Sequence, residues 1–514
     1  MGSTFSSYEI ARSGMYVSQR GLFVTGHNIS NVNTPGFVRQ QAMIADQTPM
    51  GFGKFQVGLG ADIQQTRQIR DQFLDVMYRN ESEQLGYWEA KNKMIEEIQT
   101  IIGEPSDLGL NKVIDQFFQG WHELSKDPGS LTTRALVRQR GIAFVETVNH
   151  IGTQLDKLQE DLNTEIGFKI NEINAIAARI AKLNVDIMKN ESAGDQANDL
   201  RDERNLLFDD LSKLINVDIT EKPNGIANVA IGGIYLVNGG ETAKIKADFN
   251  RPNSYFVTAY WEDTNQLVQV RNGMLKGLID ARGDVAGYKG SIENGSPDES
   301  GLGLADDASN NDAFKFDPSA NHAPKGIIPN LRRGLNILVN LVARKINEIH
   351  SAGVGIDGST GVDFFTRPDS TRPFEMGNIT INDAFNGDDG LNKIAASATG
   401  ILPGDNANAQ KIVDFRSEAF FTAKNVKVGV DDFYNAIITW VGSTGQEAAR
   451  VAENQHKLVA QIQNKKEAIS GVSMDEEMTN MMKYQHAYNA SARVINSIDE
   501  MIDQIINRMG IVGR

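Results

Sequence analysis

The heptad pattern near the end of the chain is the feature that most constrains its fold. Apolar side chains recur once per heptad along this stretch, at Met481, Tyr488, Ile495, Ile502 and Met509. A companion seam is expected at Met478, Ala492 and Ile506. Such a repeat is typical of a helix that winds along another helix, because its apolar seam stays turned toward the partner. Residues 472–514 are therefore predicted to form one long helix that needs a partner.

The start of the chain carries a matching seam. Residues 6–30 are predicted to form a helix whose seam residues alternate between spacings of four and three, at Ile10, Gly14, Val17, Gly21 and Val24. Each glycine costs a helix about 1 kcal/mol relative to alanine. Glycines on an apolar seam are explained if a second helix must approach very closely. We therefore expect the two ends of the chain to pair in one terminal domain.

The middle of the chain is expected to hold a helical rod with an inserted β-domain. At 514 residues the chain is too long for a single core. A helical pattern covers about residues 131–190, and a further amphipathic helix follows it. Residues 217–273 alternate apolar and polar side chains between Asn-Gly and Gly-Gly pairs, which predicts antiparallel strands. The predicted fold class is α+β, mostly α.

These patterns divide the chain into domains. Residues 1–45 and 472–514 are the two halves of a terminal coiled-coil-like domain, 46–216 the first part of the rod, 217–273 the β-domain, and 274–471 a second, mixed part with an exposed lobe at 285–330. The charges of the two ends cancel, so the net charge of −15 lies between them. Neutral ends suit packing against copies of the chain, whereas an acidic middle favours solubility.

The composition argues against several classes of protein. The absence of cysteine excludes disulfides and thiolate chemistry. No apolar run approaches the roughly 18–20 residues that span a membrane, and the N-terminal sequence lacks the features of a cleavable signal peptide. The acidic balance argues against nucleic acid as a partner.

The search for catalytic chemistry is nearly empty. The sequence contains no nucleophile elbow, zinc-protease pair or phosphate-binding loop, and its 7 histidines are scattered singly. The cluster "DLRDER" at 199–204 favours an ion-paired helix face, and a carboxylate-based hydrolase site is the alternative. The loop from Asp357 to Asp363 is similar to a calcium loop but lacks its alternating acidic ligands. No catalytic, metal or cofactor site is predicted.

An asparagine-rich turn follows the first helix. In "NISNVNTPG", Asn28, Asn31 and Asn33 precede a Pro-Gly pair that suits a type II turn. Taken alone, this pattern predicts a helix end followed by a turn.

The resemblance of both ends to one family adds to this interpretation. Residues 3–40, "STFSSYEIARSGMYVSQRGLFVTGHNISNVNTPGFVRQ", and 471–510, "GVSMDEEMTNMMKYQHAYNASARVINSIDEMIDQIINRMG", resemble the terminal sequences of the axial proteins of the bacterial flagellum. Three internal stretches resemble the same family, at 57–79, 347–365 and 403–416. Two departures are Phe37, where the family usually has tyrosine, and the acidic lobe.

The resemblance implies a non-enzymatic structural protein at the junction between hook and filament, with another axial protein, hook or distal rod, as the alternative. It implies export by the flagellar type III route without cleavage. The implied partners are further copies of the chain, the hook protein, a second junction protein and a cytosolic chaperone on the C-terminal helix. The proposed assembly interface comprises Ile10, Gly14, Val17, Gly21, Val24, Asn28, Asn31, Asn33, Met481, Tyr488, Ile495, Ile502 and Ile506.

Overall fold

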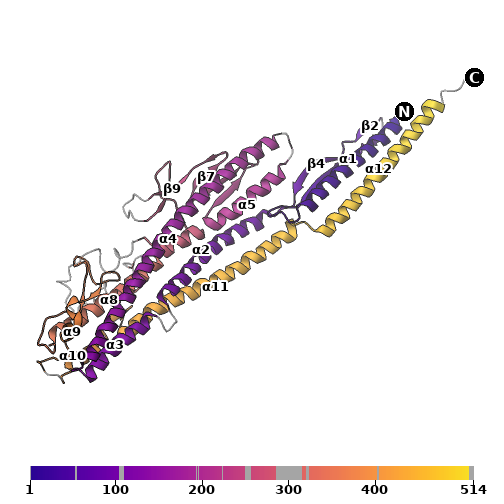
Figure 1. Ribbon diagram of the computed structural model, residues 1–514. Helices are drawn as coiled ribbons and strands as arrows, with labels where there is room; N and C mark the ends of the chain where they lie inside the picture. The colour runs from indigo at the N-terminus through magenta and orange to yellow at the C-terminus, as the bar shows by residue number, and fades with distance from the viewer. Residues whose placement is uncertain are drawn as a thin grey trace, which may run out of the picture.

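The protein is a long rod that carries both ends of the chain at one tip (Figure 1). The computed structural model describes residues 2–52, 55–103, 109–192, 194, 196–222, 224–248, 256–284, 315–319, 323, 325–401 and 404–508. Met509 and most of the lobe expected at 285–330 lie outside the described residues. No helix of the described part combines the length and the apolar character that crossing a membrane requires.

The tip is formed by the first and last helices, which lie side by side and antiparallel (Figure 1). They are α1 (Gly2–Ser30) and α12 (Met474–Arg508). Strands β1 (Gln40–Asp46) and β4 (Ala61–Gln68) form an antiparallel ladder that packs on α1, with the short hairpin β2 (Met50–Phe52) and β3 (Phe55–Val57) beyond it. Residue 45, where the first half of the terminal domain was expected to end, lies in β1.

Long helices build the rod because each buries apolar side chains along one side, the last of them mainly in its first half. They are α2 (Gln72–Ile102), α3 (Leu110–Lys126), α4 (Leu131–Glu191), α5 (Asn198–Leu214) and α11 (Val430–Ser470). At 61 residues, α4 is about 90 Å long. Its expected stripe is buried throughout, at Ile151, Leu155, Leu158, Leu162, Ile170, Ile173, Ile180, Leu183 and Ile187.

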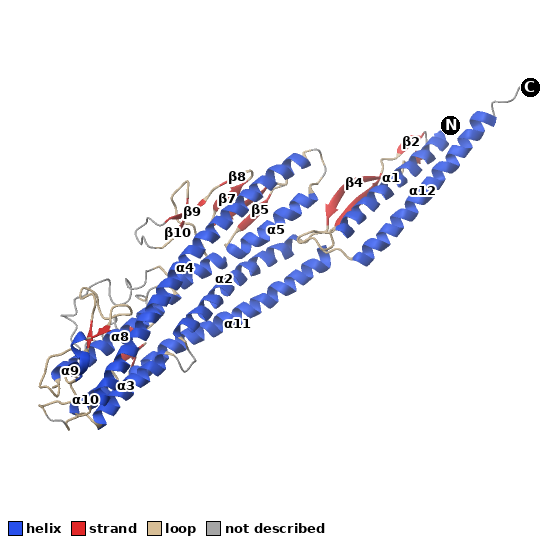
Figure 2. Cartoon of the chain, in the orientation of Figure 1, coloured by secondary structure: helices blue, strands red, loops and turns tan. Residues whose placement is uncertain are grey.

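A small β-region packs on the upper half of α4 (Figure 2). Strands β5 (Asp218–Glu221), β6 (Ala227–Ile231), β7 (Ile234–Asn238) and β8 (Glu241–Thr242) form one antiparallel sheet, and β9 (Ile245–Asp248) pairs with β10 (Thr258–Trp261). Gly232 and Gly233 both have positive φ, which suits the tight turn between β6 and β7. The strands lie inside the range 217–273 that was expected for them. Helix α6 (Gly273–Arg282) then returns to the rod.

The end of the rod opposite the termini is a mixed region. Around the buried helix α8 (Ile327–Ala352) lie β11 (Lys315–Phe316), β12 (Phe365–Thr366), β13 (Thr380–Ile381), η4 (Asp383–Phe385), α9 (Gly387–Leu391), α10 (Ala407–Phe415), β14 (Phe421–Ala423) and β15 (Val426–Val428). An aromatic cluster holds this end together. It includes Trp121 of α3, Phe144 of α4 and Phe364, all fully buried.

Candidate assembly interface on the terminal helices

Two glycines allow α1 and α12 to approach closely. A Cβ atom built on Gly21 would lie 2.7 Å from a ring carbon of Tyr484, and one on Gly14 would lie 2.9 Å from the Oγ of Ser491. Real Cβ atoms are not found so close to such atoms. Glycine at these positions therefore makes room for side chains of α12. The close helix contact expected from the spacing of Gly14 and Gly21 is present within one chain.

The inward seam of α12 agrees with half of the expected pattern. Met481, Tyr488, Ile495 and Ile502 are all half-buried along one side of the helix. The residues that alternate with them are also shielded from solvent, namely Glu477, Tyr484, Ser491 and Ile498.

Of the companion seam expected at Met478, Ala492 and Ile506, Ala492 is half-buried, whereas the other two residues are exposed. The side chains of Met478 and Ile506 are 54% and 68% exposed. The shielded residues on this side of α12 include Tyr484 and Ser491, which face Gly21 and Gly14 of α1. Because these residues are polar or partly polar, they do not form a continuous apolar pattern in the sequence. The seam is thus readable only when the two helices are considered together.

The residues proposed on α1 fall into two groups. Val17, Gly21 and Val24 are buried in the seam. Gly14 is half-buried there, whereas 44% of Ile10 remains exposed beyond it. The first group packs against α12 within one chain, and its role in an assembly interface stays a prediction.

The asparagines of the turn have different roles. Asn28 is buried: its Nδ2 donates to the carbonyl of Gln40 at 2.9 Å and to Glu477 Oε2 at 3.1 Å, and its Oδ1 accepts from Gln40 N at 3.0 Å. Asn31 Nδ2 donates to the carbonyl of His27 at 3.0 Å. Asn33 is exposed. The donor hydrogens of Asn28 are thus used inside the chain, whereas the side chain of Asn33 is exposed to solvent.

The outer faces of the terminal pair are rich in exposed apolar side chains. They are Tyr8, Ile10, Tyr16 and Phe23 on α1, and Met474, Met478, Met482, Val494, Met501, Ile505 and Ile506 on α12. Single exposed apolar residues are ordinary, but rows of them on both helices of a narrow pair mark an interaction surface. Of this group, the heptad pattern pointed to Ile10, Met478 and Ile506, because the pattern marks seams and not the flanks beside them.

The acidic cluster at 199–204 is used for structure. Arg201 pairs with Glu191 and Glu221, each at 2.6 Å. Arg179 pairs with Glu203 at 2.6 Å, which also occupies that carboxylate. Among the described residues, no group of three or more histidine or acidic side chains could hold a metal ion. The ion-paired helix face is therefore the better description of this cluster.

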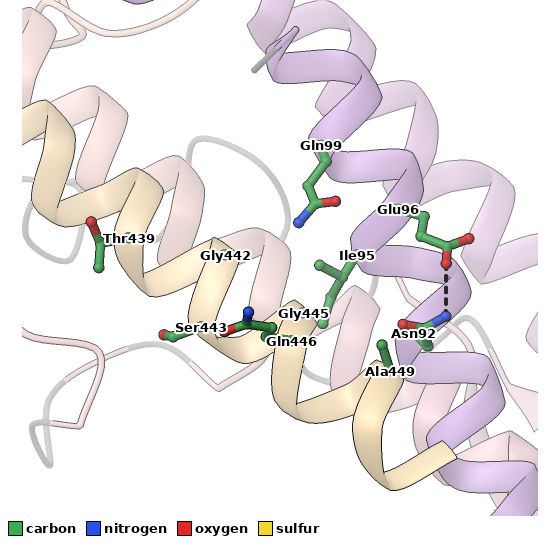
Figure 3. A pocket seen from close by; sticks show the side chains of 10 residues that line it. All are labelled: Asn92, Ile95, Glu96, Gln99, Thr439, Gly442, Ser443, Gly445, Gln446 and Ala449. Atoms are coloured by element: carbon green, nitrogen blue, oxygen red, sulfur yellow. Dashed lines mark hydrogen bonds between the residues drawn. The ribbon is translucent and has the colours of Figure 1, made fainter. Parts of the chain in front are cut away.

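A shallow hollow of about 540 Å³ lies between α2 and α11 (Figure 3). It is lined by Ile95, Gln99 and Gly445, and Asn92 donates to Glu96 at its edge. Ser443, the hydroxyl at its rim, donates to the carbonyl of Trp440. These residues bring together no nucleophile with a base, so the hollow does not resemble an active site.

A rod of long helices with a paired tip that exposes apolar side chains is the architecture of a structural protein. Comparison with known families agrees with this class. A family model described as the helical domain of the flagellar hook-associated protein FlgK matches residues 95–365, and one for the C-terminal part of the flagellar basal body rod FlgEFG proteins matches residues 467–509. The chain belongs to the flagellar hook-associated protein FlgK family.

Curated relatives cover the whole length. Flagellar hook-associated protein 1 of Bacillus subtilis is 29% identical over 537 residues, covering 100% of both chains. The protein of the same name from Salmonella typhimurium is 23% identical over 97% of this chain and 98% of that protein. The solved structure of the flagellar hook junction protein FlgK from Burkholderia pseudomallei has a TM-score of 0.57 and 12% identity, over 77% of this chain and 100% of that one, and supports the fold.

Proposed function

We propose that the protein is a structural component of the bacterial flagellum that joins the hook to the filament. It assembles with other flagellar axial proteins, and copies of it associate side by side through the outer faces of α1 and α12. The observation that carries this proposal is the set of exposed apolar side chains on both helices of the terminal pair, in a chain of this family.

The physical argument concerns where apolar surface is buried. A pair of helices covers only one side of each member, so the rows on their outer faces stay in water in a free chain. Tyr16 and Phe23 are 62% and 64% exposed, and fully burying one such side chain contributes about 1.5–3 kcal/mol. Neighbouring copies that cover both rows would gain several such contributions each.

The finer partners follow from the family. We propose that the hook protein binds on one side of the assembled ring and a second junction protein on the other. A cytosolic chaperone covers the C-terminal helix before export, and the chain leaves the cell unfolded by the flagellar type III route. The absence of cysteine suits this route, since no disulfide has to form after passage. The protein is proposed to have no catalytic activity.

Isolated hooks test the proposal directly. Purified protein is added to hooks that lack junction proteins, and electron microscopy counts the decorated tips. We expect caps at the tip of the hook only, followed by filament growth once the remaining axial proteins are supplied. Binding along the sides of the hook, or metal-dependent hydrolysis without any tip binding, would contradict the proposal. A chain truncated after Ser470, which lacks α12, serves as the control and should not bind.

A further inference from the structure

Several polar contacts hold the joint between the terminal pair and the rod. One cluster of buried apolar residues runs through the described part of the rod, from Ala90 to Ala448. The buried seam residues of α1, such as Val17 and Val24, are not part of it. Figure 2 shows β4 running from α1 to the end of the rod where α5 lies. The orientation of the tip therefore depends on the contacts made there.

Hydrogen bonds join the first turns of α5 to the strands at this joint. Asp202 Oδ2 accepts from Val38 N at 3.0 Å, and its Oδ1 accepts from Gln68 Nε2 at 2.7 Å. Asp199 Oδ1 accepts from Gln40 Nε2 at 2.7 Å. We call Asp199 and Asp202, with Val38, Gln40 and Gln68, the clasp.

Asn198 extends the clasp but leaves polar atoms without partners. Its Nδ2 donates to the carbonyl of Thr66 at 2.9 Å. The Oδ1 of Asn198 and the Oγ1 of Thr66 are buried and have no hydrogen-bond partner in the described part of the chain. A buried unsatisfied polar group costs about 1–3 kcal/mol. Several hydrogen bonds thus stabilise the closed joint, whereas the two unsatisfied oxygen atoms destabilise it. Such a balance is expected of a contact that can open.

Asp202 is the group on which the closed state depends most. Only 5% of it is exposed, and no cation of the described residues forms an ion pair with it. The nearby Arg70 lies at hydrogen-bond distance from Asp75 of α2 instead. Burial raises the pKa of Asp202 to about 7, with its hydrogen bonds and Arg70 acting in the opposite sense. A buried carboxylate without a counter-ion is costly, and holding a proton removes that cost.

The other charged groups around Asp202 are few. Asp199 lies one turn earlier on α5 and also raises the pKa of Asp202. His27 of α1 lies 3.1 Å from Asp199. Arg39, which directly precedes β1, forms ion pairs with Glu476 and with the buried Glu477 of α12.

We propose that the clasp is a proton-sensitive latch that sets the angle between the terminal pair and the rod. With Asp202 protonated the latch is closed and the tip is held in one orientation. With Asp202 ionised, opening returns the carboxylate to water, and the tip gains freedom. The shift in Asp202 makes closing about tenfold more favourable at pH 6 than at pH 8.

A distance measurement on the free chain tests the latch. The natural chain has no cysteine, so Lys189→Cys on α4 and Asn489→Cys on α12, both at exposed positions, give two specific spin labels across the joint. Pulsed electron spin resonance then reports the distribution of distances at about pH 6 and about pH 8.5, on either side of the titration. We expect a narrow distribution at the lower pH and a broader one at the higher pH.

Variants assign the effect to Asp202. Asp202→Asn cannot ionise; its Oδ1 can still accept from Val38 N, and the amide of Gln68 has to turn so that its oxygen accepts from the new Nδ2. The distribution of distances should therefore be the same at both pH values. Asp202→Ala and Gln68→Ala each remove hydrogen bonds of the clasp and should broaden the distribution of distances at both pH values. Glu203→Gln, whose ion pair with Arg179 lies outside the joint, is the matched control and should behave as the unchanged chain. Circular dichroism confirms that each variant keeps its helices.

Three results would overturn the latch: a distribution in the unchanged chain that does not depend on pH, a pH dependence that survives in Asp202→Asn, or a narrow distribution in Asp202→Ala. The second result would place the titrating group outside Asp202. Because the measurement uses the free chain, its outcome is independent of whether the protein binds hooks.

Discussion

The ring of Tyr484 occupies the space that a side chain at position 21 would need. Its carbon atoms lie 2.7 Å from where the Cβ of any other residue at Gly21 would be. Gly14 and Ser491 repeat this relationship two turns away. The two ends of the chain, separated by more than 450 residues, are thus matched to each other side chain by side chain.

Exchanging single glycines tests this match. Gly21→Ala should destabilise the terminal pair, because the new methyl group overlaps Tyr484 and overpacking costs about 1–3 kcal/mol. Gly26→Ala is the matched control in the same helix, since nothing lies within 4 Å of its new methyl group. It should stabilise α1 by about 1 kcal/mol through helix propensity. Hydrogen exchange of the amides of α1 and α12, recorded as a function of temperature, measures the stability change in each variant. Equal effects in the two variants would show that Tyr484 moves aside at no cost.

A charge in the seam should separate the helices. Ile495→Asp places a carboxylate against α1, at a half-buried position, and should cost the pair several kcal/mol. We expect faster amide exchange over α1 and α12 and no binding to hooks. Asn496→Asp adds the same charge at the exposed neighbouring position and should leave exchange within the pair unchanged. Normal hook binding by Ile495→Asp would contradict the seam.

The outer face of α1 can be tested without disturbing the pair. Tyr16→Ser removes an aromatic ring that is 62% exposed, so the free chain should keep its stability while hook binding falls at least tenfold. A tenfold loss corresponds to about 1.4 kcal/mol, less than the expected burial of the ring. Phe168→Ser removes a ring that is 68% exposed on α4 of the rod and is the control. Equal losses of hook binding in both variants would show that the interface extends beyond the terminal pair.

Much of the fold follows from the sequence because long helices repeat their apolar pattern many times. The helix predicted at about 131–190 is Leu131–Glu191 in the structure, and the strands predicted within 217–273 lie there. The ladder of β1 and β4 was not predicted. β4 is mostly polar, the register of the pair shifts between Met43 and Ile44, and the two strands are held by α1 and by each other.

The site was harder to predict than the fold because its contacts join distant parts of the chain. Asn28 looks like a turn residue until Glu477 is placed beside it. Asp202 looks like part of a solvent-exposed ion-pair face, yet it is buried against Val38 and Gln68. Periodicity shows which side of a helix is covered, but it does not show which polar groups the covering element brings.

The buried histidine of the mixed region predicts a pH dependence of stability. His350 accepts from Ala395 N at 2.9 Å and lies 2.7 Å from the carbonyl of Val362, so its ring is held neutral. Burial lowers its pKa from 6.5 to about 4. Between these values the unfolded chain takes up a proton and the folded chain does not. The free energy of unfolding should therefore decrease as the pH is lowered from 6.5 toward 4, by roughly 1.4 kcal/mol per pH unit.

A comparison with His350→Gln isolates this contribution. Asp202 acts in the opposite sense, since its raised pKa adds stability as pH falls below about 7, but it is the same in both proteins. The stability difference between the unchanged chain and His350→Gln should therefore shrink by roughly 3 kcal/mol from pH 7 to pH 4. Denaturant titrations at several pH values measure it. A constant difference would mean that His350 becomes protonated without disturbing the fold.

Limited proteolysis tests where the free chain is weakest. The terminal pair buries one seam, whereas ordering each residue costs about 1–2 kcal/mol of backbone entropy, so the pair should open far more readily than the rod. A brief protease treatment of the free chain should remove both ends and leave a stable fragment near residues 46–471. Its ends should fall in β1 to β4 and around Gly471, where α11 and α12 are separate helices. Mass spectrometry identifies the fragment, which should stay folded yet fail to bind hooks.

The same treatment of chains already assembled on hooks should leave α1 and α12 uncut, because neighbouring copies then cover their outer faces. Ends that resist the protease equally in the free chain would show that the terminal pair is stable alone, and a trimmed fragment that still caps hooks would place the assembly interface on the rod.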